Sequence, residues 1–291
     1  MLNKENYGIL KAVKCRRDII AKRMRTWNKA KYDRYIHEGR GQGEGVLYSP
    51  WIHIQDFPSR GTVSRILGSK TGRVHHFMSS NEKNYFYLLE WSDDVLDIRE
   101  QYPLIDIAMA VNLAGKAGIR YPRDSVSGFP YVLTTDFMLT VPRGFKARTI
   151  KLSSELQNAR VLEKLEIERR YWNSLDIDWR IVTEHEIPVK KVQNIEWLHT
   201  AELPADDIKY AVYFDDILNR IGSLCCQTDY PLHEIASWID HAYGFSSGTG
   251  LQILRHLLWT KRLPCTLESE IQLYPYISRG SRELQHDYCF K

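Results

Sequence analysis

The sequence contains no run approaching the ~18 consecutive apolar residues of a membrane-spanning helix. Its first residues lack the long apolar stretch and small-residue cleavage site of a secretory signal peptide. The five cysteines form no CxxC pair and show no spacing typical of zinc ligands. We therefore expect a cytoplasmic protein without membrane association, disulfide framework or zinc ribbon.

A large excess of charge of one sign is also missing, because the formal net charge is only +4. The charge is unevenly distributed, however, and phosphate binding responds to local charge. Lysines and arginines crowd residues 1–34, whereas acids outnumber them in residues 202–291. The basic arm, with Trp27, Tyr32 and Tyr35 between its cations, suits contacts to a DNA backbone, and a solvated helix is the alternative.

The 291 residues, 43% of them hydrophobic, suffice for two compact domains. After a glycine-rich loop at 39–45, hydrophobic periodicity alternates between strand and helix spacing. It predicts strands at 51–57, 95–104, 131–141, 145–152 and 178–183, helices from Ser79 or Ser80 and at 154–172, and an irregular stretch at 106–130. This order predicts an α/β fold with a mixed sheet and flanking helices.

After Pro204 the pattern changes to a mainly helical one. Helices are expected at 206–225, 232–242 and 247–260, with two short strand-like pieces at 262–274. Three helices and a hairpin indicate a winged-helix-like domain. We therefore expect three parts: a basic arm at 1–36, a catalytic domain at 37–204 and the winged-helix-like domain at 205–291.

The hairpin at 131–152 carries the candidate chemistry. With a turn centred on Arg143 and Gly144, antiparallel pairing places Asp136 opposite Lys151, and alternation puts Thr149 on the same face as Lys151. An acid and a lysine so placed form the PD…(D/E)xK pattern of restriction-endonuclease-like nucleases, in which carboxylates hold a hard cation. A cross-strand ion pair on a solvated face is the alternative, and spacing alone favours it.

Longer segments resemble the TnsA subunit of heteromeric cut-and-paste transposases. They are GRGQGEG (39–45), KTGRVHHFMS (70–79), LEWSDDVLDIREQYPL (89–104), TTDF (134–137) and LEKLEIERRYW (162–172), which follow one another in the family's order. This resemblance covers roughly residues 36–200. It implies a restriction-endonuclease-like catalytic domain and a nuclease site that comprises Glu82, Asp136 and Lys151.

The resemblance also implies a role for each residue of this site. Glu82 and Asp136 are expected to bind Mg²⁺, for which Mn²⁺ can substitute, and Lys151 to orient or deprotonate the attacking water. Glu82 has an alternative role, because Ser79 to Glu82 form a capping box. Thr149 stands where the family has glutamine, and a neutral hydroxyl holds Mg²⁺ more weakly than a carboxylate.

Other polar residues near these segments have less specific interpretations. Glu168 could support the site or belong, with Glu163 and Glu166, to the solvated face of a helix. His75 and His76 are adjacent in a strand and cannot easily bind one ion, so packing or a phosphate contact is favoured for them. Lys70 and Arg73 are phosphate candidates. Five residues in or just after the third C-terminal helix are further candidates for DNA contacts: Gln252, Arg255, His256, Lys261 and Arg262.

The resemblance predicts an endonuclease that hydrolyses the 5′ strands at transposon ends. Its expected partners are the double-stranded DNA of those ends, a TnsB-like transposase and a TnsC-like AAA+ ATPase, the last through the C-terminal domain. A prokaryotic protein that joins the nucleoid when it acts would fit this role. Two alternatives are a non-catalytic DNA-binding or scaffold subunit of the transposition complex and a stand-alone restriction-type nuclease.

Overall fold

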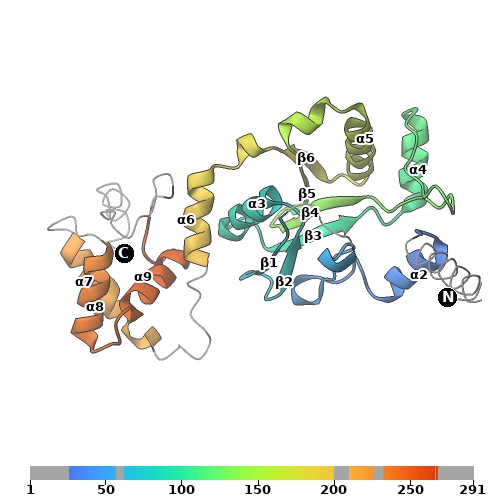
Figure 1. Cartoon of the computed structure of the whole chain (residues 1–291). Helices are drawn as coiled ribbons and strands as arrows, with labels where there is room; N and C mark the ends of the chain where they lie inside the picture. Colours follow the sequence, from blue (N-terminus) through green and yellow to red (C-terminus); the bar gives the residue numbers. More distant parts are fainter. Residues whose placement is uncertain (1–25, 57–61, 200–209, 226–231, 266, 268–291) are drawn as a thin grey trace, which may run out of the picture. The chain divides into compact units, whose positions relative to one another are not determined.

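The computed structural model describes residues 26–56, 62–199, 210–225, 232–265 and 267 (Figure 1). Contacts divide the chain into two compact units. Unit 1 comprises residues 1–60 and 96–182, and unit 2 comprises residues 61–95 and 183–291. No helix in the described ranges is long and apolar enough to span a membrane.

Unit 1 is built on a four-stranded mixed sheet. Its strands, in spatial order, are β3 (Asp97–Pro103), β4 (Thr134–Val141), β5 (Gly144–Ile150) and β6 (Asp178–Val182). The first three are antiparallel neighbours, whereas β5 and β6 are parallel and are connected through α5 (Ala159–Ser174). The predicted mixed α/β architecture is therefore confirmed for this unit.

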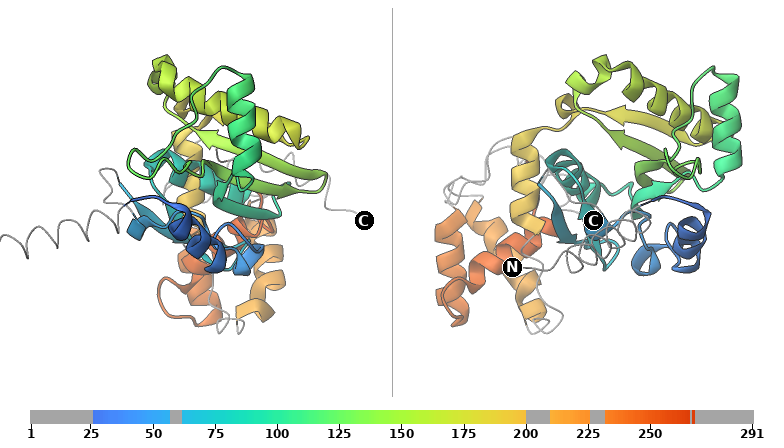
Figure 2. Two further views of the ribbon diagram at one scale, coloured as in Figure 1. Left: turned by 90° about the vertical axis from the view of Figure 1, so that its right-hand side faces the viewer. Right: turned by 45° about the vertical axis from the view of Figure 1, so that its right-hand side comes forward.

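Two helices, α4 (Ile107–Lys116) and α5, pack with the sheet of unit 1 (Figure 2). The core cluster formed by the sheet and these helices includes Met138 and Ala147 from the strands and Ile167 and Trp172 from α5. The predicted irregular stretch at 106–130 is confirmed for residues 117–130 but was wrong for its first part, where Asp106 accepts a hydrogen bond from the Met109 N–H and so begins α4. Helix α5 begins after the predicted 154, because residues 153–157 form a 3-10 turn (η3, Ser153–Gln157) and Asn158 provides the cap.

The β4–β5 hairpin has a different register from the predicted one. Val141 pairs with Gly144 and Phe137 with Arg148, so the turn residues are Pro142 and Arg143. Proline favours the second position of a tight turn because its φ is already fixed near −65°. Continued toward Asp136, this register places Thr149 opposite it, rather than Lys151.

The segment before the sheet is folded into unit 1. Helix α2 (Lys29–His37) follows Asn28, and Trp27 and Tyr35 are buried with Trp51 and Val132. Three-ten turns η1 (Gly45–Leu47) and η2 (Ile54–Asp56) follow, so the predicted strand at 51–57 was wrong. Residues 1–25 of the predicted basic arm lie outside the described residues.

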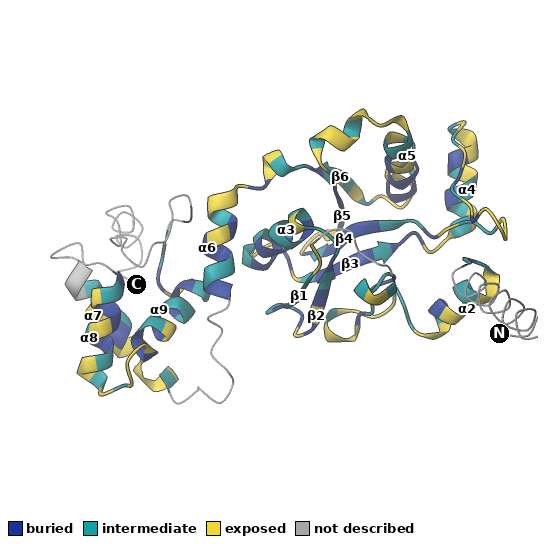
Figure 3. Ribbon diagram, viewed as in Figure 1, coloured by how far each residue is buried: buried dark blue, intermediate teal, exposed yellow. Residues whose placement is uncertain are grey.

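Unit 2 combines a small hairpin with helices. The hairpin strands are β1 (Ser64–Leu67) and β2 (Val74–Phe77), and the helices are α3 (Ser80–Trp91), α6 (Val189–His199), α7 (Phe214–Cys225), α8 (Leu232–Tyr243) and α9 (Thr249–Trp259), with a 3-10 turn, η4 (Glu184–Glu186), before α6. Helices α3, α7, α8 and α9 follow the sequence pattern, whereas α6 was not predicted. Helix α8 has a buried and an exposed face (Figure 3), while α3 is buried or half-buried beyond Ser80. The predicted boundary at 204 lies outside the described residues, as do most of the strand-like pieces at 262–274. The winged-helix-like domain therefore stays a prediction.

The aromatic cluster around Trp27 provides a stability test. Replacing a buried tryptophan with alanine removes its apolar contacts and leaves a cavity, which costs roughly 3–5 kcal/mol. We expect Trp27→Ala to lower the free energy of unfolding by about this amount in urea denaturation. Phe145→Ala, at a side chain that is 46% exposed, should cost much less, and equal losses in the two variants would contradict the packing described for Trp27.

Candidate active site

Asp136 in β4 and Lys151, directly after β5, lie together in unit 1. The Lys151 Nζ is 3.5 Å from the Asp136 Oδ2 and donates to the Ile150 carbonyl at 2.8 Å. The Ile150 N–H donates to the same carboxylate oxygen at 2.7 Å. Asp136 is only 9% exposed, so the alternative of an ion pair on a solvated face does not hold for the acid.

The strands are irregular beside Asp136. The Cα pairs of β3 and β4 include Glu100 with Phe137 and Tyr102 with Thr135 but omit the intervening Gln101 and Asp136. Gln101 has φ +49°, a left-handed conformation that costs an L-residue roughly 1–2 kcal/mol. The irregularity therefore lies in β3 at Gln101, and the register of β3 with β4 is the same on both sides of it.

Glu168 of α5 points to the sheet, not to solvent. Its Oε1 accepts hydrogen bonds from the Thr135 hydroxyl at 2.6 Å, from the Trp179 Nε1 at 3.0 Å and from the Thr149 hydroxyl. Burial raises the pKa of Glu168 to about 7, and the nearby negative charge of Asp136 acts in the same direction, while the three donors oppose it. Such a shift beside a second carboxylate is typical of functional sites. The open question about Glu168 is thus resolved in favour of a buried position near Asp136.

The other two acids of the same helix behave as the simpler interpretation predicted. Glu166 forms ion pairs with Arg169 and Arg170, and Glu163 forms one with Arg160. These pairs lie on the helix surface, where the guanidinium groups hold the pKa of Glu166 at about 2. Sequence spacing alone gave no signal that separates Glu168 from them.

Thr149 has a clear structural role. Its hydroxyl donates to Glu168 and accepts from the Trp179 Nε1 at 3.1 Å. It is 2% exposed, so it joins β5 to α5 within the core. Thr149, two residues before Lys151, is therefore a hydrogen-bond partner of the Glu168 carboxylate on α5.

Glu82 belongs to unit 2 and lies in the first turn of α3. Its backbone N–H donates to the Ser79 hydroxyl at 3.2 Å, while its carboxylate accepts from that hydroxyl at 2.8 Å and from the Met78 N–H at 3.1 Å. The capping role is therefore confirmed, with Met78 rather than Ser79 as the backbone donor to the carboxylate.

Several other candidates are engaged within unit 2. His75 is fully buried, bonded to the Thr71 hydroxyl at 2.7 Å and packed on Phe86, so its packing role is confirmed. Arg73 is 8% exposed, which does not suit the phosphate contact considered for it. Lys70 donates to the Ser92 carbonyl at 2.8 Å, and burial lowers its pKa.

The DNA candidates at helix α9 also have intramolecular partners. Arg255 donates to the Trp197 carbonyl and lies over the Trp197 ring, 4.6 Å from its centroid. Lys261 and Arg262 form ion pairs with Asp93 and Asp215, respectively. These contacts give the three cations structural roles.

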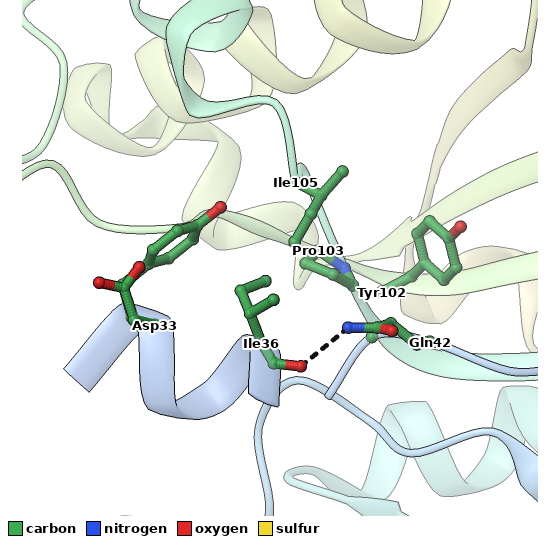
Figure 4. A pocket seen from close by; sticks show the side chains of 8 residues that line it. Asp33, Ile36, Gln42, Tyr102, Pro103 and Ile105 are labelled. Atoms are coloured by element: carbon green, nitrogen blue, oxygen red, sulfur yellow. Dashed lines mark hydrogen bonds between the residues drawn. The ribbon is translucent and has the colours of Figure 1, made fainter. Parts of the chain in front are cut away.

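Unit 1 has a cavity of about 450 Å³ that lies apart from Asp136 and Lys151, neither of which lines it. Asp33 and Ile36 from α2 line one side, and Pro103 and Ile105 line the other (Figure 4). The Gln42 amide, which donates to the Ile36 carbonyl at 3.0 Å, lies at its edge. None of the predicted catalytic residues lines this space.

Comparison with known proteins identifies the family. Residues 92–184 match the family described as TnsA-like endonuclease N terminal, and residues 186–267 match TnsA endonuclease C terminal. The chain is also 39% identical, over 245 residues, to the transposon Tn7 transposition protein TnsA of Escherichia coli, an alignment that covers 82% of this chain and 86% of that protein. The chain belongs to the TnsA endonuclease family.

Family membership makes this chain a TnsA-like transposon endonuclease and indicates chemistry with a divalent metal. Asp136, Lys151 and Glu168 fall within the segment that matches the TnsA-like N-terminal family, whereas Glu82 precedes it. Within the described residues, no three or more histidine, cysteine, aspartate or glutamate side chains form a metal-binding group. Protein sites for Mg²⁺ commonly use one or two carboxylates together with water molecules.

The pKa of Glu168 predicts a pH dependence of stability in the metal-free protein. In the folded chain its pKa is about 7, against 4.5 for an unperturbed glutamate. Between these values the folded state binds more protons than the unfolded state, so stability falls as pH rises to about 7 and stays lower above it. Relative to Glu168→Gln, the wild type should lose up to about 3 kcal/mol between pH 4.5 and 8.

Urea denaturation with a chelator present measures this difference. Glu166→Gln is the matched control in the same helix, because the pKa of Glu166 is about 2 and its charge does not change in this interval. A difference between wild type and Glu168→Gln that stays constant from pH 4.5 to 8 would show that Glu168 does not titrate as described.

Proposed function

We propose that this TnsA-like endonuclease hydrolyses the 5′ strands at transposon ends, with Asp136, Lys151 and Glu82 as its catalytic residues. The observation that carries this proposal is the contact between the buried Asp136 and Lys151, with the buried Glu168 bonded to the neighbouring Thr135 and Thr149. Asp136 is largely removed from water and has the Lys151 ammonium group beside it. This arrangement suits phosphodiester hydrolysis better than the role of a surface ion pair.

Asp136 has the capacity to hold a metal ion. Its Oδ2 accepts from the Ile150 N–H and lies near Lys151, whereas its Oδ1 has a longer contact of 3.5 Å to the Gln101 amide. Carboxylate oxygens are hard ligands that Mg²⁺ prefers. We infer that Asp136 and Glu82 hold Mg²⁺ or Mn²⁺, with Glu82 assigned by the family resemblance.

A bound divalent cation would polarise the phosphoryl oxygen and lower the pKa of a water molecule. Lys151 would then orient the attacking water and stabilise the negative charge that develops on the phosphoryl group. Its Nζ is already held by the Ile150 carbonyl and the Asp136 carboxylate, so little reorganisation is needed. Glu168 supports this site through Thr149, since it fixes the strand that presents Lys151.

The partners are proposed from the family. The relative is named as a transposition protein of transposon Tn7, and a transposition nuclease needs double-stranded DNA ends and a strand-joining partner. We infer a TnsB-like transposase for the joining step and a TnsC-like AAA+ ATPase that contacts the C-terminal part. Family membership favours this enzyme over the scaffold alternative, and dependence on partner subunits would separate it from a stand-alone nuclease.

A strand-specific cleavage assay with Mg²⁺, partner subunits and transposon-end DNA tests the assignment of Asp136 and Lys151. Asp136→Ala and Lys151→Ala should each lower the rate of 5′-strand cleavage by roughly 100-fold or more, because each removes charge at the reacting phosphate. Lys146→Ala, a lysine within the same strand, and Asp33→Ala, on the surface of α2, are the controls. Cleavage at the wild-type rate in Asp136→Ala or Lys151→Ala would refute the assignment.

Glu82→Gln separates the capping role from the metal role. Glutamine at this helix position still serves in a capping box, so the unfolding temperature should change little. Removal of the carboxylate charge should nevertheless raise the Mg²⁺ concentration required for half-maximal cleavage. An unchanged requirement, with the fold intact, would leave Glu82 as a cap only.

A further inference from the structure

Gln101 adopts an unusual backbone conformation for a strand residue. It lies within β3, is 4% exposed and has φ +49°. The other two described non-glycine residues with positive φ, Asp176 and Lys261, come just after the ends of helices α5 and α9, where the left-handed conformation is common. Glycine would adopt this angle without strain, so the presence of glutamine suggests that its side chain is required.

Contacts on both its backbone and its side chain hold Gln101 in place. Its carbonyl accepts from the N–H of the buried Trp51 at 3.2 Å. Its amide oxygen accepts from the Thr134 hydroxyl at 3.2 Å, which directs the amide nitrogen to the Asp136 Oδ1 at 3.5 Å. The strained residue is therefore linked to the acid of the proposed site.

Asp136 is contacted from both of its neighbouring strands. From the β5 side, the Ile150 N–H and Lys151 contact Oδ2, and from β3 the Gln101 amide contacts Oδ1. Contacts to both oxygens restrict rotation of the carboxylate about its final bond. A neutral amide does this without adding a charge that would compete with a cation.

We propose that Gln101 is a positioning residue that fixes the orientation of the Asp136 carboxylate for metal binding. This inference rests on the proposed function, because Gln101 acts through Asp136. The strain at Gln101 is retained because the carbonyl and the side chain are both held.

The test uses the full chain and compares Gln101→Leu with Gln101→Gly. Leucine keeps much of the side-chain volume but lacks the amide, and glycine removes both the amide and the backbone strain. Loss of such an outer contact to a metal ligand typically lowers metal affinity 10- to 100-fold. We expect this loss in both variants, measured as Mn²⁺ binding by electron paramagnetic resonance, with a parallel rise in the Mg²⁺ requirement for 5′-strand cleavage.

Stability measurements separate positioning from a structural role. Gln101→Gly should keep or raise the unfolding temperature, because its strain is relieved, yet bind Mn²⁺ as weakly as Gln101→Leu. Gln42→Leu, at a glutamine whose amide donates to a backbone carbonyl elsewhere in unit 1, should bind Mn²⁺ as the wild type does. If leucine prevents folding, the glycine variant alone decides.

The outcomes also distinguish this inference from the proposed function. If Asp136→Ala abolishes Mn²⁺ binding while both Gln101 variants bind as the wild type does, the role of Gln101 is refuted and the site stands. If Asp136→Ala binds Mn²⁺ normally, the proposed metal site itself is wrong. Weaker binding in Asp136→Ala and in both Gln101 variants, with wild-type affinity in Gln42→Leu, is the result expected.

Discussion

The hydrogen bond from the Ile150 N–H to the Asp136 carboxylate is the contact on which the site depends. It lies just past the last Cα pair of β4 and β5, and it holds the acid beside Lys151. A buried polar group without a hydrogen-bond partner is costly, so this contact also stabilises the buried carboxylate. The backbone donor and the lysine together fix the position of the Asp136 carboxylate at the end of β5.

Polar groups buried around Asp136 connect β3, β4, β5 and α5. Glu168 is bonded to Thr135 and Thr149, and Trp172 and Trp179 donate to the same two hydroxyls. Such networks are stronger in a low-dielectric interior, but each member is costly if left without a partner. The same burial that raises the pKa of Glu168 therefore also makes the arrangement rigid. Gln101, at the edge of this network, adopts a strained backbone conformation that lowers stability, while its amide contacts the Asp136 carboxylate.

Local sequence signals predicted much of the fold. Ser79 and the apolar spacing behind it located α3, and the alternation around Asp136 and Lys151 located β4 and β5. The hairpin register was missed by one turn position, because both Pro142–Arg143 and Arg143–Gly144 are plausible turn pairs and only strand packing chooses between them. Asp106 was a usable signal for α4, but the glycine and proline residues that follow it favoured an irregular segment.

The site was less accessible to sequence reasoning than the fold. The hairpin correctly predicted that Asp136 and Lys151 lie close together, although not that they are directly opposed. The position of Glu168 depends on contacts with Thr135 and Thr149, which are distant from it in sequence. A positive φ at a glutamine has no sequence signal, since glycine is the residue that usually marks such angles. For Glu82, in contrast, the local sequence pattern correctly predicted the capping role. Only the family resemblance suggested a second role in metal binding.

A crystal structure of the full chain with Mn²⁺, with the metal located by its anomalous scattering, tests the central claim most directly. The account predicts an anomalous peak within coordination distance of an Asp136 carboxylate oxygen, with Lys151 next to it. Mn²⁺ bound elsewhere in the chain, with the Asp136 carboxylate free of metal at saturating concentration, would contradict it.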